Sequence, residues 1–223
     1  MSGQQGLRPS SDIHAYLVEQ LNLTLRRPGM YGGESAVRLV IDHLAFVEDL
    51  DGVWSAHRDA MEARGSFTVT GVMGAFARLI PKAYEYGMAS VYAEFARDRG
   101  WLRTERVLGG DEYARMSRTL AGWVEQDRRL ADVLDTFGDP SVVFGGSNPR
   151  YGKTLGYVSG DLADPMVSFH LWNGVDPQVD GAWPTYDEPI LIAARRGSGR
   201  FDQTFAFTPT GKRLRPIDDR PSG

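Results

Sequence analysis

The spacing of apolar residues changes near Pro140, and this change limits the folds open to the 223-residue chain more than any other feature. Before Pro140, apolar residues recur every three to four positions, as in Ile13, Leu17, Leu21 and Leu25, which is the period of an α-helix. After Pro140, the apolar segments are short and alternate with a period of two, which is typical of β-strands. The first part of the chain is therefore expected to be helical and the second part to be built of strands.

The helical part divides into segments at proline and glycine residues. The sequence predicts helices over about 13–25, 34–47 and 54–61, a helix over about 70–99 that Pro81 kinks or breaks, and one amphipathic helix from 111 to about 137. Candidate strands follow over 142–144, 154–159, 166–172, 189–195 and 201–208, and 212–215 is a sixth candidate. Turn sequences such as Ser-Gly-Asp and Gly-Ser-Gly separate these strands, which favours hairpins.

A run of helices followed by a run of hairpins predicts an α+β fold, with an N-terminal helical part packed on a C-terminal, mostly antiparallel sheet. We expect a helical region over 1–138, a β region over 139–215 and a loose tail over 216–223. The chain contains no repeat and no low-complexity linker, so the two regions are expected to form one cooperative unit.

The composition argues against several classes of function. The formal net charge is -4 and the pI is about 5.6, which gives no support for binding to nucleic acid or to anionic membranes. No apolar run approaches the roughly 18 residues of a membrane span, and the N-terminus lacks the apolar stretch of a signal peptide. We therefore expect a soluble, cytoplasmic protein. Its 26 glycines and its scarcity of lysine resemble proteins from GC-rich bacterial genomes such as those of actinobacteria.

No metal site or cofactor is predicted. The chain has no cysteine, which excludes disulfides, thiol catalysis and Cys-type zinc sites. The four histidines show neither HxH nor HExxH spacing; they are His14, His43, His57 and His170. The sequence therefore offers no histidine-rich ligand set and no cofactor fingerprint.

The segment VVFGGSNPRYGKTLGYV, residues 142–158, is similar to a phosphate-binding loop because it contains Gly-Lys-Thr after a strand. In such a loop a glycine lies at the position that Ser147 occupies here, and Pro149 removes one backbone N–H that would contact phosphate. A helix must also follow the lysine, so that its N-terminus faces the phosphates. The residues after Lys153 have the pattern of a strand, so a nucleotide enzyme of this type is not favoured.

The 147–154 loop still concentrates polar side chains that could bind an anion. Two cations and several hydrogen-bond donors lie within eight residues, beside two glycines. The alternative is an ordinary turn at Asn148-Pro149 with solvated charges. The candidate ligand-binding residues are Ser147, Asn148, Arg150, Tyr151, Lys153 and Thr154.

His170 is the candidate general base of an enzymatic alternative. Strand alternation places Ser168, His170 and Trp172 on one face of the predicted 166–172 strand. A histidine at such a position could accept a proton from a substrate, with a nearby aspartate to orient its ring. The other interpretation is a half-buried histidine whose hydrogen bond is structural. The aspartates considered for the orienting role are Asp161, Asp164 and Asp176.

The segment RRPGMYGG, residues 26–33, precedes an apolar helical pattern. It resembles the RPGMY-x-G segment before the ATP-binding helix in the ATPase domain of type II topoisomerase B subunits. In that family the helix has the pattern E-x-x-D-N, whereas residues 40–46 are VIDHLAF here, and the D-x-G-x-G nucleotide motif is also missing. The resemblance therefore implies no ATPase activity for this chain. The segment is also similar to one in a group of small uncharacterised bacterial proteins, which implies no activity.

The same segment has a structural interpretation. Pro28 ends the first helix, and the glycines at 29, 32 and 33 allow a turn. Met30 and Tyr31 are then expected to pin this turn to the core.

Two functional hypotheses follow. The favoured one is a non-enzymatic binding or interaction protein of a bacterium, with a regulatory, immunity or defence-associated role and another protein as its partner. The alternative is a cofactor-free enzyme or small-molecule binder that acts on an anionic substrate at the 147–154 loop, with His170 as the catalytic residue. A pocket lined by both the loop and the His170 face would favour the enzyme.

Overall fold

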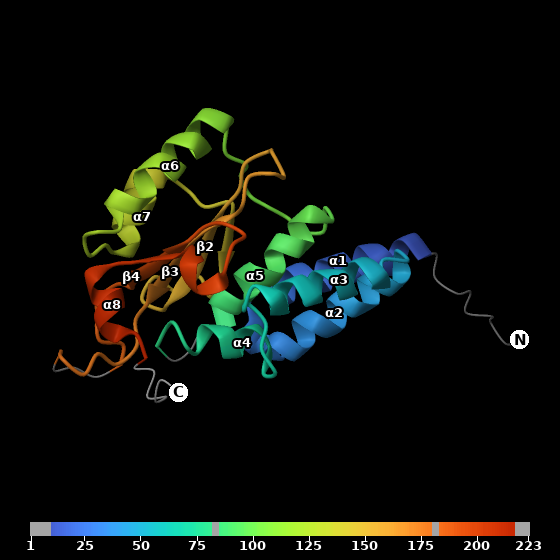
Figure 1. Cartoon of the computed structure of the whole chain (residues 1–223), viewed down its shortest axis with the longest axis horizontal. Coiled ribbons are helices and arrows are strands. Elements are labelled where there is room, and N and C mark those ends of the chain that lie inside the picture. The colour runs from blue at the N-terminus through green and yellow to red at the C-terminus, as the bar shows by residue number, and fades with distance from the viewer. Residues whose placement is uncertain (1–9, 82–84, 180–182, 217–223) are drawn as a thin grey trace, which may run out of the picture.

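The helices and strands follow the predicted order (Figure 1). The computed structural model describes residues 10–81, 85–179 and 183–216. The helices in this part of the chain are α1 (Ser10–Arg26), α2 (Gly33–Val47), α3 (Asp51–Ala63), α4 (Gly71–Phe76), α5 (Glu85–Asp98), α6 (Gly110–Trp123), α7 (Leu130–Phe137) and α8 (Pro209–Leu214). Short 3-10 helices cover η1 (Pro28–Met30) and η2 (Phe201–Thr204). The strands are β1 (Val142–Phe144), β2 (Lys153–Tyr157), β3 (Val167–Trp172), β4 (Ile190–Arg195) and β5 (Phe205–Phe207).

The five strands form one antiparallel sheet in the order β1-β2-β3-β4-β5, so each strand pairs with its neighbours in sequence. This order needs no crossover connection, although the loops between the strands are longer than the two-residue turns of the tightest hairpins. The predicted α+β fold with a mostly antiparallel C-terminal sheet is therefore confirmed.

Helices cover both faces of the sheet (Figure 1). In β3, Phe169 and Leu171 point into a core shared with α6 and α7, whereas Trp172 belongs to the core shared with α1–α5. Every residue of β3 is buried, because successive side chains enter opposite cores. The helices before the sheet thus divide into two groups that enclose it, rather than forming one layer on one face.

The prediction of a single helix over 111–137 is wrong. Two helices cover this range: α6 ends at Trp123 and α7 begins at Leu130. The carboxylate of Asp132 accepts a hydrogen bond of 2.8 Å from the backbone N–H of Arg129, which caps the start of the second helix. Trp123 then packs edge-to-face on Phe137 with ring centroids 4.9 Å apart. The chain reverses so that both apolar faces reach the sheet.

The prediction of a strand over 212–215 is also wrong, because residues 209–214 form α8. The hydroxyl of Thr208 accepts a hydrogen bond of 3.0 Å from the backbone N–H of Gly211, and Pro209 starts the helix. The predicted strand over 201–208 is shorter than expected, since η2 precedes β5. The N–H of Phe201 bonds to the carbonyl of Arg64 (2.8 Å), which holds this segment away from the ladder. The predicted helix over 70–99 is broken as expected, but α4 already ends at Phe76, before Pro81, and α5 begins at Glu85. Residues 82–84 and the tail after 216 lie outside the described residues.

The turn at residues 27–33 differs from its predicted role. Pro28 ends α1 and is buried, but Met30 and Tyr31 are 72% and 40% exposed, so they do not pin the turn to the core. The 3-10 turn η1 directs both side chains outward. Gly32 and Gly33 have φ of +93° and +66°, a conformation that glycine adopts at little cost before α2.

Candidate functional site

The 147–154 loop connects β1 to β2 and is ordered by its own hydrogen bonds. The side chain of Asn148 accepts from the backbone N–H of Arg150 (3.0 Å), which forms the predicted turn at Asn148-Pro149. The Lys153 ammonium donates to the carbonyls of Gly146 and Asn148 at 3.1 and 2.9 Å. The lysine therefore closes the loop from inside.

The segment after Lys153 is β2, not a helix, so a phosphate-binding loop with a helix N-terminus is absent here. Strand alternation separates the two residues at the end of the loop. Lys153 lies on the same face of β2 as Leu155 and Tyr157, toward α6 and α7. Thr154 lies on the opposite face, where its hydroxyl is 3.1 Å from Nδ1 of His170.

His170 is fully buried. Its ring packs edge-to-face on Phe76 and stacks on Phe205, with centroids 5.4 and 5.6 Å away. Burial, with a smaller contribution from Arg195, holds the pKa of His170 well below its ordinary value. The ring is therefore neutral, and in this conformation no solvent-borne substrate reaches it.

The aspartates considered as orienting groups make other contacts. Asp164 accepts from the hydroxyl of Ser159 (2.6 Å), and Asp161 from the backbone N–H of Ala163 (2.9 Å). Asp176 accepts from Arg213 and from Tyr186, which lowers the pKa of its carboxyl.

The remaining loop residues point in several directions. Tyr151 is 41% exposed and stacks on Trp183 with centroids 5.2 Å apart. Arg150 is exposed, and its carbonyl accepts from Asn173 (2.7 Å). Ser147 and Lys153 line a pocket of about 440 Å³, which we call the loop pocket. Its other walls come from the end of α1, from α7 and from β1, and His170 is not among its lining residues.

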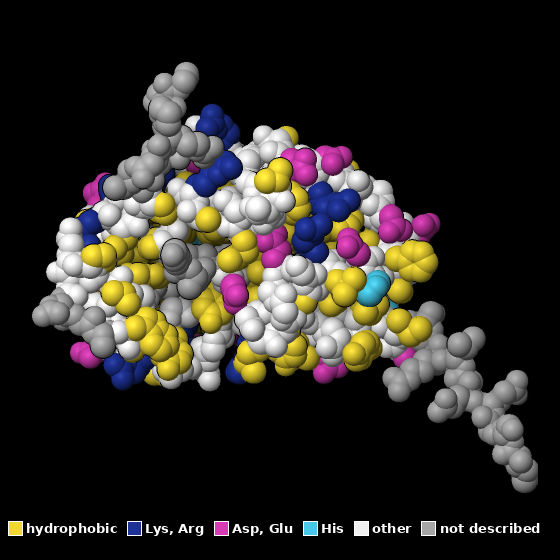
Figure 2. Space-filling model, turned by 90° about the horizontal axis from the view of Figure 1, so that it is seen from below, with side chains coloured by type: hydrophobic (Ala, Val, Ile, Leu, Met, Phe, Trp, Pro, Cys, Tyr) yellow, Lys and Arg dark blue, Asp and Glu magenta, His cyan; other side chains and the backbone are white. Residues whose placement is uncertain are grey.

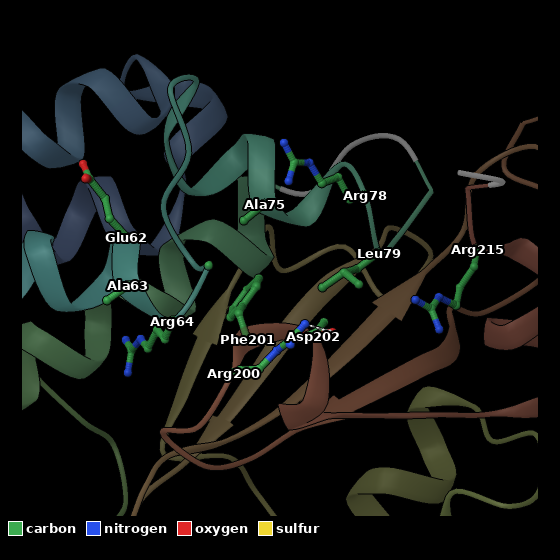
Figure 3. Close-up of a pocket in the computed structure, with 11 residues that line it drawn as sticks. Glu62, Ala63, Arg64, Ala75, Arg78, Leu79, Arg200, Phe201, Asp202 and Arg215 are labelled. Atoms are coloured by element: carbon green, nitrogen blue, oxygen red, sulfur yellow. Dashed lines mark hydrogen bonds and ion pairs between the residues drawn. The ribbon is translucent and has the colours of Figure 1, made fainter. Parts of the chain in front are cut away.

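A second pocket, of about 540 Å³, lies between the ends of α3 and α4 and the η2 turn (Figure 3). We call it the arginine pocket because four arginines line it. Figure 3 places Phe201 near its centre, with Arg64 and Arg215 on opposite sides. The arginines are Arg64, Arg78, Arg200 and Arg215.

Among the described residues, the lining of the arginine pocket has an excess of positive charge. It contains two carboxylates, those of Glu62 and Asp202, against four guanidinium groups. Asp202 pairs with Arg200 at 3.2–3.3 Å, and the carboxylate of Glu62 points away from the other labelled side chains (Figure 3). Within the described part of the chain, no ion pair or side-chain hydrogen bond engages Arg78, and Arg215 stacks on Phe207 at 4.6 Å without a carboxylate partner.

A further positive charge lies close to the pocket, because the guanidinium of Arg195 is 5.9 Å from the ring centroid of Phe201. Glu94 accepts from the buried Arg195 at 2.6 Å, and Arg64 is 3.9 Å from the same carboxylate. Burial lowers the pKa of Arg64; Glu94 raises it and Arg195 lowers it. Both guanidinium groups nevertheless stay charged. The single carboxylate of Glu94 is therefore the partner of two cations, Arg64 and Arg195.

Sequence reasoning missed the arginine pocket entirely. Its four arginines come from four separate segments, none of which forms a motif, and the acidic net charge conceals a local cationic site. The low lysine and high arginine content was the one feature of the sequence that pointed to arginine, and composition does not indicate which arginines lie close together in the fold. On the face seen in Figure 2, Lys and Arg lie in small clusters among Asp and Glu.

Among the described residues, no three His, Asp or Glu side chains gather closely enough to hold a metal ion. None of the described helices combines the length and the apolar character that crossing a membrane requires. No protein-family model, curated protein or solved structure matches this chain significantly.

Proposed function

We propose that this protein is a non-enzymatic binding protein, with a regulatory, immunity or defence-associated role in a bacterium, and that it binds a small polyanion in the arginine pocket. One observation carries the proposal: four arginines line a single pocket, and two of them have no carboxylate partner among the described residues. The pocket volume of about 540 Å³ falls in the range typical of small-molecule sites.

The chemistry of arginine supports a ligand with several phosphate or carboxylate groups. Each planar guanidinium can donate two parallel hydrogen bonds to an oxyanion, and such charge-assisted bonds are stronger than neutral ones. Cations held close together repel one another, so an anion that bridges them relieves this repulsion. Phe201, which is 4% exposed, adds a buried apolar surface for the body of the ligand.

The enzymatic alternative receives less support from the geometry. It requires His170 to act together with the 147–154 loop, but the loop pocket and the His170 ring lie on opposite faces of β2 and β3. Catalysis would therefore need a rearrangement that exposes a fully buried ring.

An interaction with another protein is a second proposal, compatible with the first. Apolar side chains at the α1–α2 end of the molecule are exposed: Tyr16 by 55%, Leu39 by 55% and Phe46 by 75%. Hydrophobic side chains are visible at this end, on the right of Figure 2. Apolar side chains exposed on neighbouring helices can take part in protein interfaces. Capture of a partner by the immobilised wild type, but not by Phe46→Glu, would support this; equal capture would contradict it.

The polyanion proposal is tested by titration calorimetry with pyrophosphate, citrate and ADP at two salt concentrations. We expect at least one of them to bind, with an affinity that falls as salt rises, because exposed charges are screened. Arg78→Gln and Arg215→Gln should each raise Kd by about tenfold or more, the value of one charge-assisted contact. Arg118→Gln is the matched control, since Arg118 is exposed on α6 in the other helical group.

Two results would contradict the proposal. The first is an absence of binding for all three anions at low salt. The second is binding that Arg78→Gln and Arg215→Gln leave unchanged. Turnover of a bound anion, followed by phosphorus and proton NMR, would replace the non-enzymatic interpretation with an enzymatic one.

A further inference from the structure

We infer that the loop pocket is a second ligand site, independent of the arginine pocket, which binds an amphiphilic organic acid: one carboxylate on an apolar body. The two pockets have no lining residue in common. The inference rests on the cations at one part of the loop pocket, on its apolar wall and on its size.

The cationic part is formed by Lys153 together with the end of α1. Lys153 is 6% exposed, and its ammonium donates to two loop carbonyls. A lysine ammonium has three N–H donors, so one remains for a ligand. No carboxylate pairs with Lys153 in the described part of the chain. A buried charge without a counter-charge is costly, and an anion in the pocket would remove this cost.

Two arginines, Arg26 and Arg27, also line the loop pocket, and Arg27 adds to this positive charge. Among the described residues, the Arg27 side chain donates one hydrogen bond, to the Met30 sulfur (3.9 Å), and it has no carboxylate partner. Arg26 pairs with Glu105 at 2.6 Å, so its charge is largely compensated. Among the described residues that line the loop pocket, Asp139 is the one carboxylate. Lys153 and Arg27 therefore leave an excess of positive charge that suits a single carboxylate better than a polyanion.

The apolar wall would receive the body of the ligand. Leu130 and Leu134 lie one turn apart on α7 and are only half-buried, and Val143 and Leu155 extend this surface across β1 and β2. The backbone N–H of Gly145 bonds to the carbonyl of Arg26 (2.7 Å), which holds the hairpin beside the cationic end of α1. A volume of about 440 Å³ suits a small organic acid.

The test is titration calorimetry of the full chain with three probes: octanoate, 1-octanol and inorganic phosphate. Octanoate presents both the charge and the apolar body, whereas each of the other probes presents only one. We expect octanoate to bind at least about tenfold more tightly than either, the effect of one added charge-assisted contact. Arg27→Gln and Leu134→Gln should each weaken octanoate binding about threefold or more, and Lys153→Met should weaken it most.

Each variant tests a different part of the loop pocket. Arg27 is exposed and Leu134 half-buried, so their replacements test the site even where Lys153→Met disturbs the loop. Arg78→Gln and Arg118→Gln should leave octanoate binding unchanged, which makes failure of this inference distinguishable from failure of the polyanion site. Three results would overturn the inference. The first is equal affinity for octanoate and 1-octanol, and the second is octanoate binding that Arg27→Gln and Leu134→Gln do not alter. The third is no octanoate binding at about 10 mM, a concentration at which even a Kd of about 1 mM would be detected.

Discussion

Glu34 shows how a single side chain joins three helices of the N-terminal group. Its carboxylate accepts hydrogen bonds from the backbone N–H groups of Val72 (2.6 Å) and Met73 (3.0 Å) at the start of α4. It also accepts from the hydroxyl of Tyr92 on α5 (2.6 Å). Burial and the neighbouring Glu34 raise the pKa of Tyr92, so the phenol remains a donor. One residue of α2 thereby fixes α4 and α5, and the α4 segment supplies Ala75 and the nearby Arg78 to the wall of the arginine pocket.

Replacement of Glu34 by glutamine should lower the free energy of unfolding by about 1–3 kcal/mol, the cost of leaving buried donors without a partner. The amide keeps the size of the side chain but replaces one acceptor oxygen with an NH2 group. This donor then faces the N–H or O–H groups that donate to Glu34 in the wild type, so a hydrogen bond is lost. Urea unfolding followed by circular dichroism measures the effect. Glu19→Gln is the control, because Glu19 is exposed on α1. Equal losses for the two variants would show that the Glu34 contacts do not stabilise the fold.

Gly211 decides how the last helix lies on the sheet. An added Cβ at this position would be 1.8 Å from the carbonyl oxygen of Ile192, which belongs to the backbone of β4 and cannot rotate away. Thr208 reinforces the contact, because its hydroxyl donates to the carbonyl of Leu191 (2.8 Å). The position of helix α8 therefore depends on a close backbone approach at Gly211, in addition to the packing of Leu214 against the core.

Gly211→Ala should displace α8 and lower the free energy of unfolding by more than about 2 kcal/mol, since overpacking against backbone is among the severe classes of substitution. Gly122→Ala is the matched control. Gly122 lies in α6 with no atom within 4 Å of an added Cβ, so alanine there should be neutral or stabilise by up to about 1 kcal/mol. Equal stability of Gly211→Ala and wild type in urea unfolding would contradict the assigned contact.

These elements explain which parts of the fold can be predicted from the sequence. The alternation over 166–172 correctly separates His170 and Trp172 from Phe169, because strand period is a local property. The sequence pattern predicts a strand over 212–215 where the structure has a helix, since a short polar segment has no clear period and the approach of Gly211 to Ile192 is a tertiary contact. Closeness in sequence groups residues 147–154 into one site, but strand alternation turns Lys153 and Thr154 to opposite faces of the sheet.

In the whole molecule, the core between the N-terminal helices and the sheet holds two histidines, His57 and His170, against aromatic rings. His57 stacks on Trp54 and packs at a tilt against Phe95, with ring centroids 5.9 and 4.7 Å away. Burial, with smaller contributions from Arg64 and Arg99, lowers the pKa of His57 to about 4. Because His170 is fully buried and its pKa is also lowered, we expect the two histidines to make this core sensitive to acid.

Stability should therefore fall as the pH decreases from about 6.5 to about 4. A histidine whose pKa is lowered in the folded state binds a proton more readily when the chain unfolds. The contribution of His57 to the free energy of unfolding is therefore fully present above the unfolded pKa of 6.5. It is lost as the pH falls toward the folded pKa of about 4. We expect the free energy of unfolding to drop by about 2 kcal/mol through His57 over this interval, after allowance for solvent screening.

Urea unfolding at pH 7 and pH 4.5 measures the drop. His57→Phe keeps the aromatic stack and removes the titration, so its drop should be smaller; His43→Gln, at an exposed site on α2, should behave like the wild type. If His57→Phe and wild type lose the same stability between the two pH values, the acid sensitivity arises elsewhere, with His170 as the next group to replace.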